Sequence, residues 1–343
     1  GTMNRVPKVS ILLPCYNAAE TLDEALDSLA LQSLRDYELV AVDDGSNDST
    51  PEKLRQRAEN DPRLRVLALP HGGIIAALNA GLAACRGEYV ARMDADDRAH
   101  PARLEKQLIY LEDHPEVAVL GCRVAGFPPD QVREGFRIYL QWQNALLSDA
   151  EIRREMFVES PVAHPSVMVR RQWLEEVGGY QEHGWAEDYD LWLRLYLAGA
   201  RFAKLPEILL EWRERPERLT RRDGRYSLEN FLRAKAFYLG KGPLAGRDAV
   251  MIWGAGMIGR RLSKHLLRQD VPLVAFIDID PRKIGRLRRD RPILSPDELP
   301  DWWGRYQNPV VLAAVGARGA RALIRERLNA MSLCEGRDWW GVA

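Results

Sequence analysis

Three short clusters of carboxylates are the residues most able to do chemistry in this chain. They are Asp-Asp-Gly-Ser-Asn-Asp at 43–48, Asp-Ala-Asp-Asp at 94–97 and Glu-Asp-Tyr-Asp at 187–190. Carboxylate oxygens bind hard cations such as Mg²⁺ and Mn²⁺, and a positioned carboxylate can act as a general base. Each cluster also has a structural interpretation, as a capped turn, a solvated acidic loop or a helix cap.

The cluster at 94–97 has the spacing of a metal site. Asp94 and Asp96 are two residues apart, so on an extended segment their side chains point to the same side. Adjacent carboxylates repel one another unless a cation neutralises them. The pattern therefore predicts a Mn²⁺ or Mg²⁺ site formed by Asp96 and Asp94.

The cluster at 187–190 precedes a segment with helical periodicity at 191–198. A helix macrodipole stabilises an ionised carboxylate at the helix N-terminus, which suits a general base. Helix capping explains acidic residues at this place equally well.

The elements that position these clusters alternate between strands and helices. Apolar runs at 9–13, 38–42, 65–69 and 89–93 are separated by segments with helical periodicity. This alternation predicts an α/β fold with a parallel sheet, in which ligands bind beyond the carboxyl ends of the strands. The first two acidic clusters directly follow the second and fourth of these strands.

The middle of the chain differs from the first 120 residues. Residues 127–160 are helical in pattern and rich in aromatic side chains. Phe136, Tyr139 and Trp142 form a stripe that is more typical of a core than of a surface on which a ligand stacks. Glycines and a proline at 240–243 end a predicted helix. We therefore predict a first domain at 3–240, a linker at 241–246 and a second domain at 247–343.

The second domain carries a dinucleotide-binding fingerprint. A predicted strand at 250–253 leads into Gly254, Gly256 and Gly259, and Asp278 follows 19 residues later, after a strand at 274–277. Such glycines allow a tight turn, a pyrophosphate can bind at the helix N-terminus, and the acid can bind a ribose. The pattern indicates a small Rossmann-like domain that binds a nucleotide; an empty structural unit is the alternative.

The ordered set of motifs resembles the family 2 glycosyltransferases with the GT-A fold. The resemblance covers roughly residues 8–239, and the matching stretches are 9–17, 42–50, 77–82, 87–97, 164–168, 178–180 and 187–192. It implies a Rossmann-like mixed sheet and an inverting transfer of sugar from a nucleotide-diphosphate sugar, most often a UDP-sugar, to an acceptor hydroxyl. Bacterial polysaccharide or glycoconjugate synthesis is the implied setting.

The resemblance also implies a role for individual residues. Asp188 would be the general base, with Glu187 beside it, and Asp96 with Asp94 would bind the metal at the diphosphate. His164 and Trp185 would lie near the acceptor, although a lone histidine and a tryptophan are also common in cores. The nucleotide-sugar would contact Pro14, Tyr16, Asn17, Asp43, Asp44, Asn79 and Asp94.

One position departs from the family pattern. Many relatives carry a metal-binding histidine after the helix that bears the base, whereas this chain offers Arg213 and Arg215. Arginine cannot bind a cation, but it pairs with phosphate oxygens. We predict that these two arginines contact the donor diphosphate; a solvated basic loop is the alternative.

Composition excludes several classes of protein. No stretch of the 343 residues approaches the roughly 20 apolar residues of a transmembrane helix, and four scattered cysteines do not form a disulfide scaffold. Residues from 246 onward carry 17 Lys and Arg against 11 Asp and Glu. These arginines are dispersed, with only 282–291 clustered, so a solvated surface is expected and no nucleic-acid partner is predicted. The expected location is cytoplasmic, with a membrane-peripheral one and a homo-oligomer left open.

Two other functions remain as alternatives. An NAD-linked sugar-nucleotide oxidoreductase would use the second domain, although only about 90 residues follow its glycines and no Tyr-x-x-x-Lys pair is present. A non-catalytic sugar-nucleotide sensor would not need the acidic residues for turnover. The acceptor, whether a glycan, a lipid-linked sugar or a protein, is not indicated by the sequence.

Overall fold

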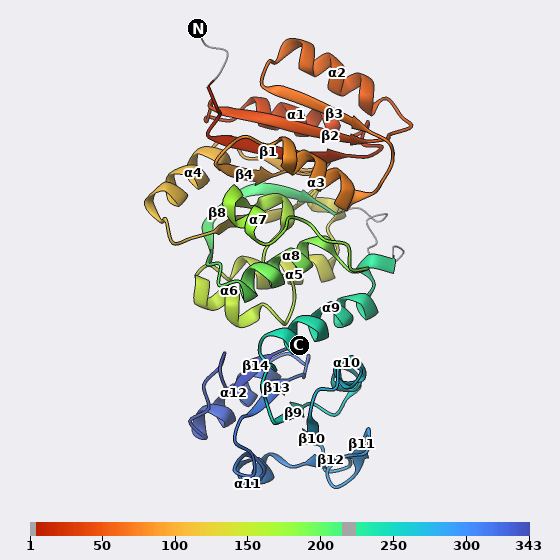
Figure 1. Cartoon of the computed structure of the whole chain (residues 1–343), viewed down its shortest axis with the longest axis vertical. Coiled ribbons are helices and arrows are strands. Elements are labelled where there is room, and N and C mark those ends of the chain that lie inside the picture. The colour runs from red at the N-terminus through yellow and green to blue at the C-terminus, as the bar shows by residue number, and fades with distance from the viewer. Residues whose placement is uncertain (1–4, 215–223) are drawn as a thin grey trace. The chain divides into compact units, whose positions relative to one another are not determined.

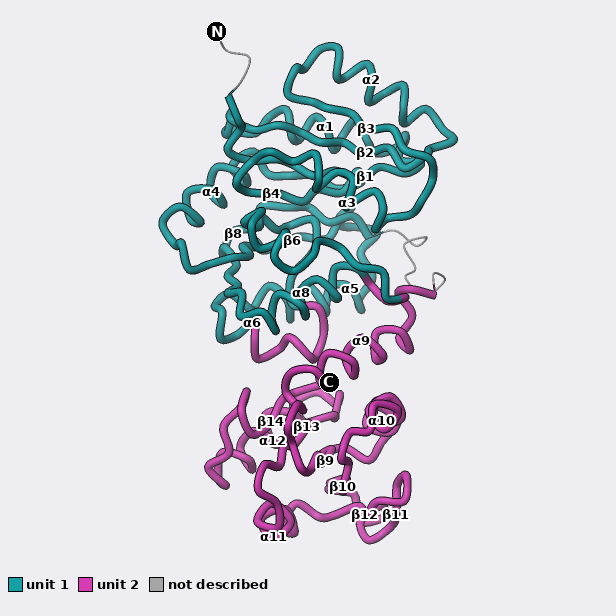
Figure 2. Tube along the Cα trace, viewed as in Figure 1, with its two compact units in different colours: residues 1–152, 161–183, 187–219 teal, residues 153–160, 184–186, 220–343 magenta. Residues whose placement is uncertain are grey.

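The chain forms two compact units, shown in teal and magenta in Figure 2. The computed structural model describes residues 5–214 and 224–343. Unit 1 comprises residues 1–152, 161–183 and 187–219, and unit 2 comprises residues 153–160, 184–186 and 220–343. The sequence-based boundary at 241–246 lies later in the chain and remains a prediction.

Unit 1 is built on a mixed sheet, whose strands in the described part of the chain follow the order β3-β2-β1-β4-β7-β6-β8-β5. The strands are β1 (Val9–Cys15), β2 (Tyr37–Asp44), β3 (Leu64–Leu69), β4 (Tyr89–Arg92), β5 (Arg98–Ala99), β6 (Val119–Phe127), β7 (Met168–Arg170) and β8 (Phe202–Arg213). The first four in spatial order are parallel, and β7 pairs antiparallel with β4. Their parallel carboxyl ends therefore meet at one edge of the sheet (Figure 1).

Helices cover the sheet because its strands are apolar on both faces. The helices of this part are α1 (Leu22–Ala30), α2 (Thr50–Asn60), α3 (Ile74–Ala84), α4 (Arg103–Asp113), α5 (Glu134–Asn144), α7 (Arg171–Glu176) and α8 (Glu187–Leu197). Ile11 of β1 is fully buried in a cluster with Leu22 of α1 and Leu104 of α4. The next residue, Leu12, faces α3, where a Cβ at Gly81 would lie 2.3 Å from its side chain. Successive side chains of β1 thus pack against helices on opposite faces of the sheet.

Unit 2 contains a second sheet with the order β11-β12-β10-β9-β13-β14. Its strands are β9 (Ala249–Trp253), β10 (Leu273–Ile277), β11 (Leu287–Arg288), β12 (Arg291–Leu294), β13 (Pro309–Ala313) and β14 (Trp339–Gly341). Its helices are α9 (Leu228–Lys241), α10 (Met257–Leu267), α11 (Leu299–Trp303) and α12 (Ala320–Ala330), and the division between the units falls within α6 (Asp149–Glu155). All strand pairs are parallel except β11 with β12.

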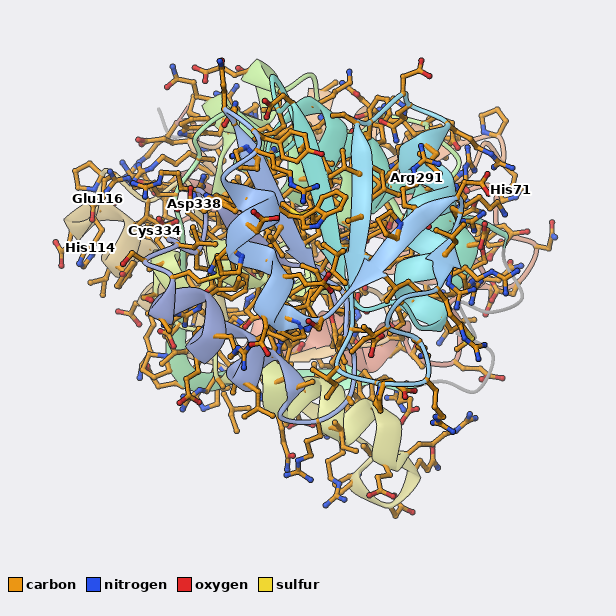
Figure 3. All side chains as sticks on the ribbon, turned by 90° about the horizontal axis from the view of Figure 1, so that it is seen from below. His71, His114, Glu116, Arg291, Cys334 and Asp338 are labelled. Carbon is orange, nitrogen blue, oxygen red and sulfur yellow. The ribbon has the colours of Figure 1, made fainter. Side chains whose placement is uncertain are left out.

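These observations confirm the predicted fold class of an α/β unit with a mixed sheet followed by a smaller α/β unit. Cys15, Cys85 and Cys122 are buried and Cys334 is exposed, all as free thiols. Cys334 lies beside Asp338 (Figure 3). The backbone N–H of Cys334 donates a hydrogen bond to Oδ2 of Asp338 at 2.8 Å. None of the helices described is both long and apolar enough to cross a bilayer.

Candidate active site

The acidic loop after β4 brings three carboxylates together. Asp94, Asp96 and Asp97 each offer an oxygen atom, and these oxygens lie within 4.8 Å of one another. Asp97 is buried, and the other two are partly exposed. A donor set made only of carboxylate oxygens fits a hard divalent cation such as Mg²⁺ or Mn²⁺. The structure thus groups the two residues predicted to bind metal and adds Asp97.

The side chain of Arg92, the last residue of β4, holds the acidic loop in position. The side chain is only 2% exposed, and it donates from Nη1 to the carbonyls of Leu12 and Met93. From Nη2 it donates to Oδ1 of Asp94 at 2.8 Å. A buried cation at the end of an apolar strand therefore holds one of the predicted ligands in place.

The end of β8 reaches the same loop. Asp97 Oδ1 accepts the backbone N–H of Arg213 at 2.9 Å, and Arg213 Nε donates to the carbonyl of Asp96 at 2.9 Å. Arg213 also pairs with Glu24 at 2.9 Å. The structure places Arg213 beside the acidic loop, and its contact with the donor diphosphate remains a prediction. Arg215 lies outside the described residues.

Asp43 and Asp44 form the carboxyl end of β2. Asp43 Oδ1 accepts hydrogen bonds from the hydroxyl and the backbone of Ser46, which closes the following turn. Asp44 accepts the backbone N–H groups of Gly72 and Gly73 on its two oxygens, at 2.9 and 3.1 Å. Asp44, which is predicted to contact the nucleotide-sugar, therefore also holds the loop that leads into α3.

The loop after β1 lies beside the turn after β2. Pro14 is opposite Val42 in the sheet register. Asn17 has a φ of 49°, and its Oδ1 accepts the backbone N–H of Asn47 at 2.8 Å. The structure therefore brings the predicted nucleotide-binding segments 14–17 and 43–47 together.

Tyr16 forms an aromatic pair that the sequence did not predict. Its ring is 46% exposed and stacks on His71 with centroids 4.3 Å apart. His71, labelled in Figure 3, also lies 3.0 Å from Asp44 Oδ2. The only sequence signal for His71 is its place before Gly72-Gly73 at the end of a predicted strand.

Asn79 on α3 holds a turn. Its Oδ1 accepts the backbone N–H of Tyr180 and its Nδ2 donates to the carbonyl of Tyr180, both at 2.9 Å. The close approach requires a glycine next to Tyr180, since a Cβ at Gly179 would lie 2.9 Å from Asn79 Oδ1. The structure therefore assigns Asn79 a positioning role toward Tyr180, and its contact with the donor remains a prediction.

The predicted base lies at the start of α8. Glu187 is 6% exposed, and Asp188 is half-buried. The third acid of this cluster, Asp190, is fully buried and pairs with Arg194 at 2.8 Å. Asp190 therefore stabilises the helix, and the two acids before it are placed at the positive end of the macrodipole.

His164 connects the two acidic regions. Its Nε2 lies 3.1 Å from Arg92 Nε and 2.7 Å from the hydroxyl of Tyr180. Its Nδ1 lies 3.9 Å from Glu187 Oε1. Burial, and then the charge of Arg92, hold the pKa of His164 well below its usual value. A neutral, 5%-exposed ring with these partners positions other groups; its contact with an acceptor remains a prediction.

Trp185 belongs to unit 2 and is buried there. Its ring packs near Phe237 and Tyr238 of α9, with centroids 5.6 and 6.3 Å away, and the guanidinium of Arg233 lies 5.6 Å from it. These contacts correspond to the core-packing interpretation of Trp185.

The glycine-rich turn of unit 2 has the predicted strand-turn-helix context. Gly254 follows β9, Gly256 precedes α10, and a Cβ at Gly259 would lie 1.9 Å from the Gly254 carbonyl oxygen. Asp278 follows β10 and accepts the backbone N–H of Ala255 on Oδ2 at 3.0 Å. Its carboxylate thus holds the glycine-rich turn.

A mixed sheet with an acidic loop beyond its central strand defines unit 1 as a nucleotide-sugar transferase fold of the GT-A type. The family model "Glycosyl transferase family 2" matches residues 10–178. The chain belongs to family 2 of the glycosyltransferases, and it is therefore an enzyme of the glycosyl-transfer class.

Curated relatives carry the same assignment. The chain is 35% identical over 218 residues to the amylovoran biosynthesis glycosyltransferase AmsE of Erwinia amylovora, covering 63% of this chain and 79% of the relative. It is 34% identical over 233 residues to EpsE of Bacillus subtilis, covering 66% of this chain and 81% of EpsE.

A solved structure supports the fold. S. aureus TarS, residues 1–349, superposes with a TM-score of 0.55 at 22% identity, covering 69% of this chain and 67% of that chain.

Proposed function

We propose that this enzyme transfers a sugar from a UDP-sugar to an acceptor hydroxyl with inversion at the anomeric carbon. The observation that carries the proposal is the chain of contacts from Asp94 through Arg92 and His164 to Glu187. It joins the acidic loop beyond β4 to the start of α8. These contacts link the candidate donor-binding loop to Glu187, the residue before the candidate base Asp188.

The nucleoside would bind at the ends of β1 and β2. Tyr16 and His71 offer a stacking surface for a base. Asp44 lies against His71 and retains acceptor capacity, since a carboxylate has about four lone-pair sites. A uracil ring presents an N–H donor, which such an acceptor would recognise. Asn17 and Asp43 shape the surrounding turns.

The diphosphate would lie at the acidic loop. Asp96 and Asp94 would hold a divalent cation, Mn²⁺ or Mg²⁺, with Asp97 beside them. Such a cation acts as a Lewis acid that stabilises negative charge on a leaving diphosphate. Arg213 would add positive charge at the same place, although part of that charge is balanced by Glu24.

Asp188 would remove the proton from the acceptor hydroxyl. It starts α8, where the macrodipole keeps a carboxylate ionised, and it follows Glu187, which is held near His164. In a single in-line displacement, the acceptor oxygen attacks the anomeric carbon while the diphosphate leaves. No covalent glycosyl-enzyme forms, so no nucleophilic side chain is needed.

The setting that we propose is bacterial polysaccharide or glycoconjugate synthesis. Two relatives are named for amylovoran and O-antigen biosynthesis. Membership in the family favours transfer over the two alternatives, an NAD-linked oxidoreductase and a non-catalytic sensor.

A donor screen tests the proposal directly. Release of nucleoside diphosphate is followed with UDP-, GDP- and dTDP-sugars, with and without oligosaccharide acceptors. We expect UDP-sugars to be preferred, and UDP binding to weaken by about 1–3 kcal/mol in Asp44→Ala, the cost of a lost charge-assisted hydrogen bond. Tighter binding of GDP or dTDP would contradict the donor assignment. The exposed Asp113→Asn variant provides the charge control.

A further inference from the structure

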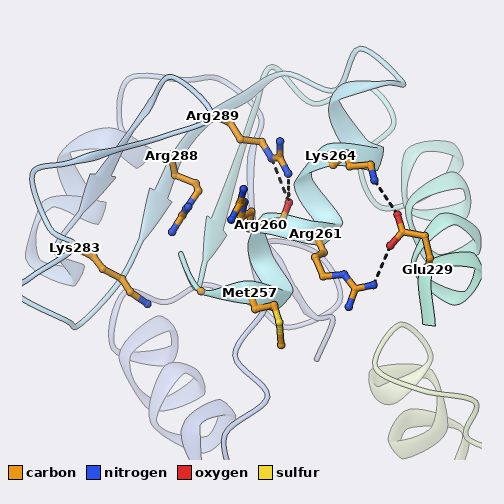
Figure 4. A pocket seen from close by; sticks show the side chains of 9 residues that line it. Glu229, Met257, Arg260, Arg261, Lys264, Lys283, Arg288 and Arg289 are labelled. Atoms are coloured by element: carbon orange, nitrogen blue, oxygen red, sulfur yellow. Dashed lines mark hydrogen bonds and ion pairs between the residues drawn. The ribbon is translucent and has the colours of Figure 1, made fainter. Parts of the chain in front are cut away.

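Unit 2 contains a basic pocket of about 620 Å³ beside its glycine-rich turn (Figure 4). Helix α10 forms one wall, and the segment around β11 forms the other. The cationic side chains that line it are Arg260, Arg261, Lys264, Lys283, Arg288 and Arg289. Glu229 is the one acid among the lining residues.

Only part of this positive charge is balanced. Glu229 pairs with Arg261 at 3.0 Å and with Lys264 at 3.1 Å, and these contacts, led by that with Lys264, lower the pKa of Glu229 to about 2. In contrast, Arg260, Arg288 and Arg289 form no ion pair with any described residue. The pocket therefore has a surplus of positive charge at the end nearest β11.

The unbalanced arginines lie close enough to affect one another. Burial, followed by the charges of Arg260 and Arg288, lowers the pKa of Arg289. Arg289 donates to the carbonyl of Arg260 and to the hydroxyl of Ser263, which fixes its guanidinium over α10. Bringing like charges together costs free energy that a bound anion would offset.

Arg288 shows an unsatisfied donor at the same place. Its Nη2 donates to the carbonyl of Ala255 in the glycine-rich turn at 2.9 Å. Its Nε is buried and has no hydrogen-bond partner among the described residues. A buried donor without a partner costs free energy, so this nitrogen is suited to an acceptor supplied by a ligand.

The pocket lies on one side of the glycine-rich turn. On this side, Lys283 Nζ lies 3.8 Å from the position of a Cβ at Gly256, just before α10. On the other side, a Cβ at Gly254 would lie 2.7 Å from the carbonyl oxygen of Ala314, so the turn packs against the end of β13. The cations therefore approach the helix N-terminus from the β11 side.

Asp278 is less available to a ribose than the fingerprint suggests. Its two oxygens accept the backbone N–H groups of Ala255 and Asp280, and Lys283 lies 4.0 Å away. Because both Asp278 oxygens accept backbone N–H groups, we do not expect this pocket to recognise a ligand mainly through its ribose. The main chemical feature of the pocket is positive charge next to the N-terminus of an 11-residue helix.

We propose that this pocket binds a nucleotide with several phosphate groups, through Arg260, Arg288, Arg289 and Lys283 at the N-terminus of α10. The volume is within the range of small-molecule sites, roughly 300–1,000 Å³, and exceeds the needs of a single phosphate. Recognition depends on phosphate charge, so ligands with a polyphosphate or an additional monophosphate are favoured over NAD⁺. The site lies within unit 2 and is distinct from the donor site of unit 1.

Isothermal titration calorimetry on the full chain tests this proposal. The probes are ATP, coenzyme A, NADP⁺, NAD⁺ and inorganic tripolyphosphate, in metal-free buffer containing saturating uridine, which can compete at the base-binding part of the donor site but carries no phosphate for this pocket. We expect ATP, coenzyme A and NADP⁺ to bind at least about 10-fold more tightly than NAD⁺, the ratio expected when one charge-assisted contact differs. Weaker binding of tripolyphosphate than of ATP would show that the nucleoside contributes, as proposed.

Charge-removing variants locate the site. Arg260→Gln is the main variant, because the Arg260 side chain makes no ion pair with any described residue and its loss should leave the fold intact. We expect an affinity for ATP at least about 10-fold lower, whereas Arg327→Gln, on α12 and outside the pocket, should bind as the unchanged chain does.

The proposal would be overturned by no binding of any nucleotide probe, by unchanged affinity in Arg260→Gln, or by NAD⁺ binding as tightly as NADP⁺. Equal affinity for tripolyphosphate and ATP would also contradict it, since the ligand would then be a polyphosphate without a nucleoside.

Discussion

The side chain of Arg92 donates a hydrogen bond from Nε to Nε2 of His164 at 3.1 Å. A guanidinium has no acceptor, so Nε2 of His164 must be unprotonated. The proton of the neutral ring then sits on Nδ1, the atom that faces Glu187. A buried arginine at the end of β4 therefore determines the tautomer of a histidine next to the start of α8.

Because burial and the charge of Arg92 lower the pKa of His164, we predict that the ring stays neutral at the pH where an ordinary histidine titrates, about 6.5. Its ring nitrogen shifts, measured by NMR and assigned with His164→Gln, should show the Nδ1–H tautomer at that pH. The unfolded chain binds a proton below about pH 6.5 that the folded chain does not, so this residue makes the folded state less stable as the pH falls. Titration of His164 near pH 6.5 would contradict the assignment.

Removing the ring of Tyr16 should weaken donor binding. Stacking of a base on an aromatic side chain contributes about 1–3 kcal/mol, so Tyr16→Ala should lower the affinity for UDP by roughly that amount, measured by calorimetry. Tyr16→Phe keeps the ring and should retain nearly full affinity. If both variants bind UDP equally well, the base does not stack on Tyr16.

Chelation of divalent cations should abolish transfer. With EDTA present, we expect loss of activity that Mn²⁺ or Mg²⁺ restores, and Asp96→Asn should need a higher metal concentration for the same rate. The measurement is nucleoside diphosphate release against metal concentration. Full activity in EDTA would show that positive side chains such as Arg213 stabilise the diphosphate without a metal.

Replacing Asp188 with Asn should separate catalysis from binding. The amide keeps the shape of the side chain but cannot accept a proton, so turnover should fall by roughly 10²–10⁴-fold, the usual contribution of a general base. UDP-sugar affinity should change little, because the base contacts the acceptor.

One control accompanies Asp188→Asn. His183, five residues before Asp188, also carries a side chain that could accept a proton, and His183→Ala should reduce turnover far less. Near-normal turnover in a folded Asp188→Asn enzyme would move the base to Glu187, and loss of donor binding would indicate that Asp188 mainly maintains the site.

Lys204 should make the stability of unit 1 depend on alkaline pH. Burial lowers the pKa of Lys204 to about 7, while Nζ donates to the carbonyls of Gln143 and Pro161. Between about pH 7 and 10.5 the unfolded chain binds a proton that the folded chain has lost, so the free energy of unfolding should rise with pH, by up to about 1.4 kcal/mol per unit.

Denaturant unfolding at a series of pH values measures this effect. Lys204→Met should show a flatter pH dependence, whereas Lys106→Met, at an exposed position, should follow the unchanged chain. Parallel pH profiles for the Lys204→Met variant and the unchanged chain would contradict the prediction.

The sequence predicted the parallel half of the first sheet because its strands are continuous apolar runs. Strands β1, β2 and β4 lie where those runs occur, and the acidic clusters follow them. The pairing of β6 with β8 was not predicted. It joins residues about 80 positions apart, such as Val119 with Phe202, and no local pattern specifies such a partner.

The residues that the site residues contact could not be predicted from local sequence patterns either. Arg92 is a charged residue inside an apolar strand, and its burial is explained only by the carbonyls, the carboxylate and the imidazole around it. A role for His71 in the site is indicated only by its stacking on Tyr16, which lies 55 residues earlier in the chain. Residue types indicated the chemistry, whereas the contacts between distant segments required the structure.

Asn79 matches the backbone of Tyr180 atom for atom, one acceptor to the N–H and one donor to the carbonyl. An aspartate has the same size but no donor, so it would place a negative oxygen against the carbonyl of Tyr180. Spontaneous deamidation of Asn79 would make that replacement without any mutation. The hydroxyl of Tyr180 also contacts His164. Deamidation of Asn79 would therefore shift Tyr180 and, through it, the position of His164 next to Glu187.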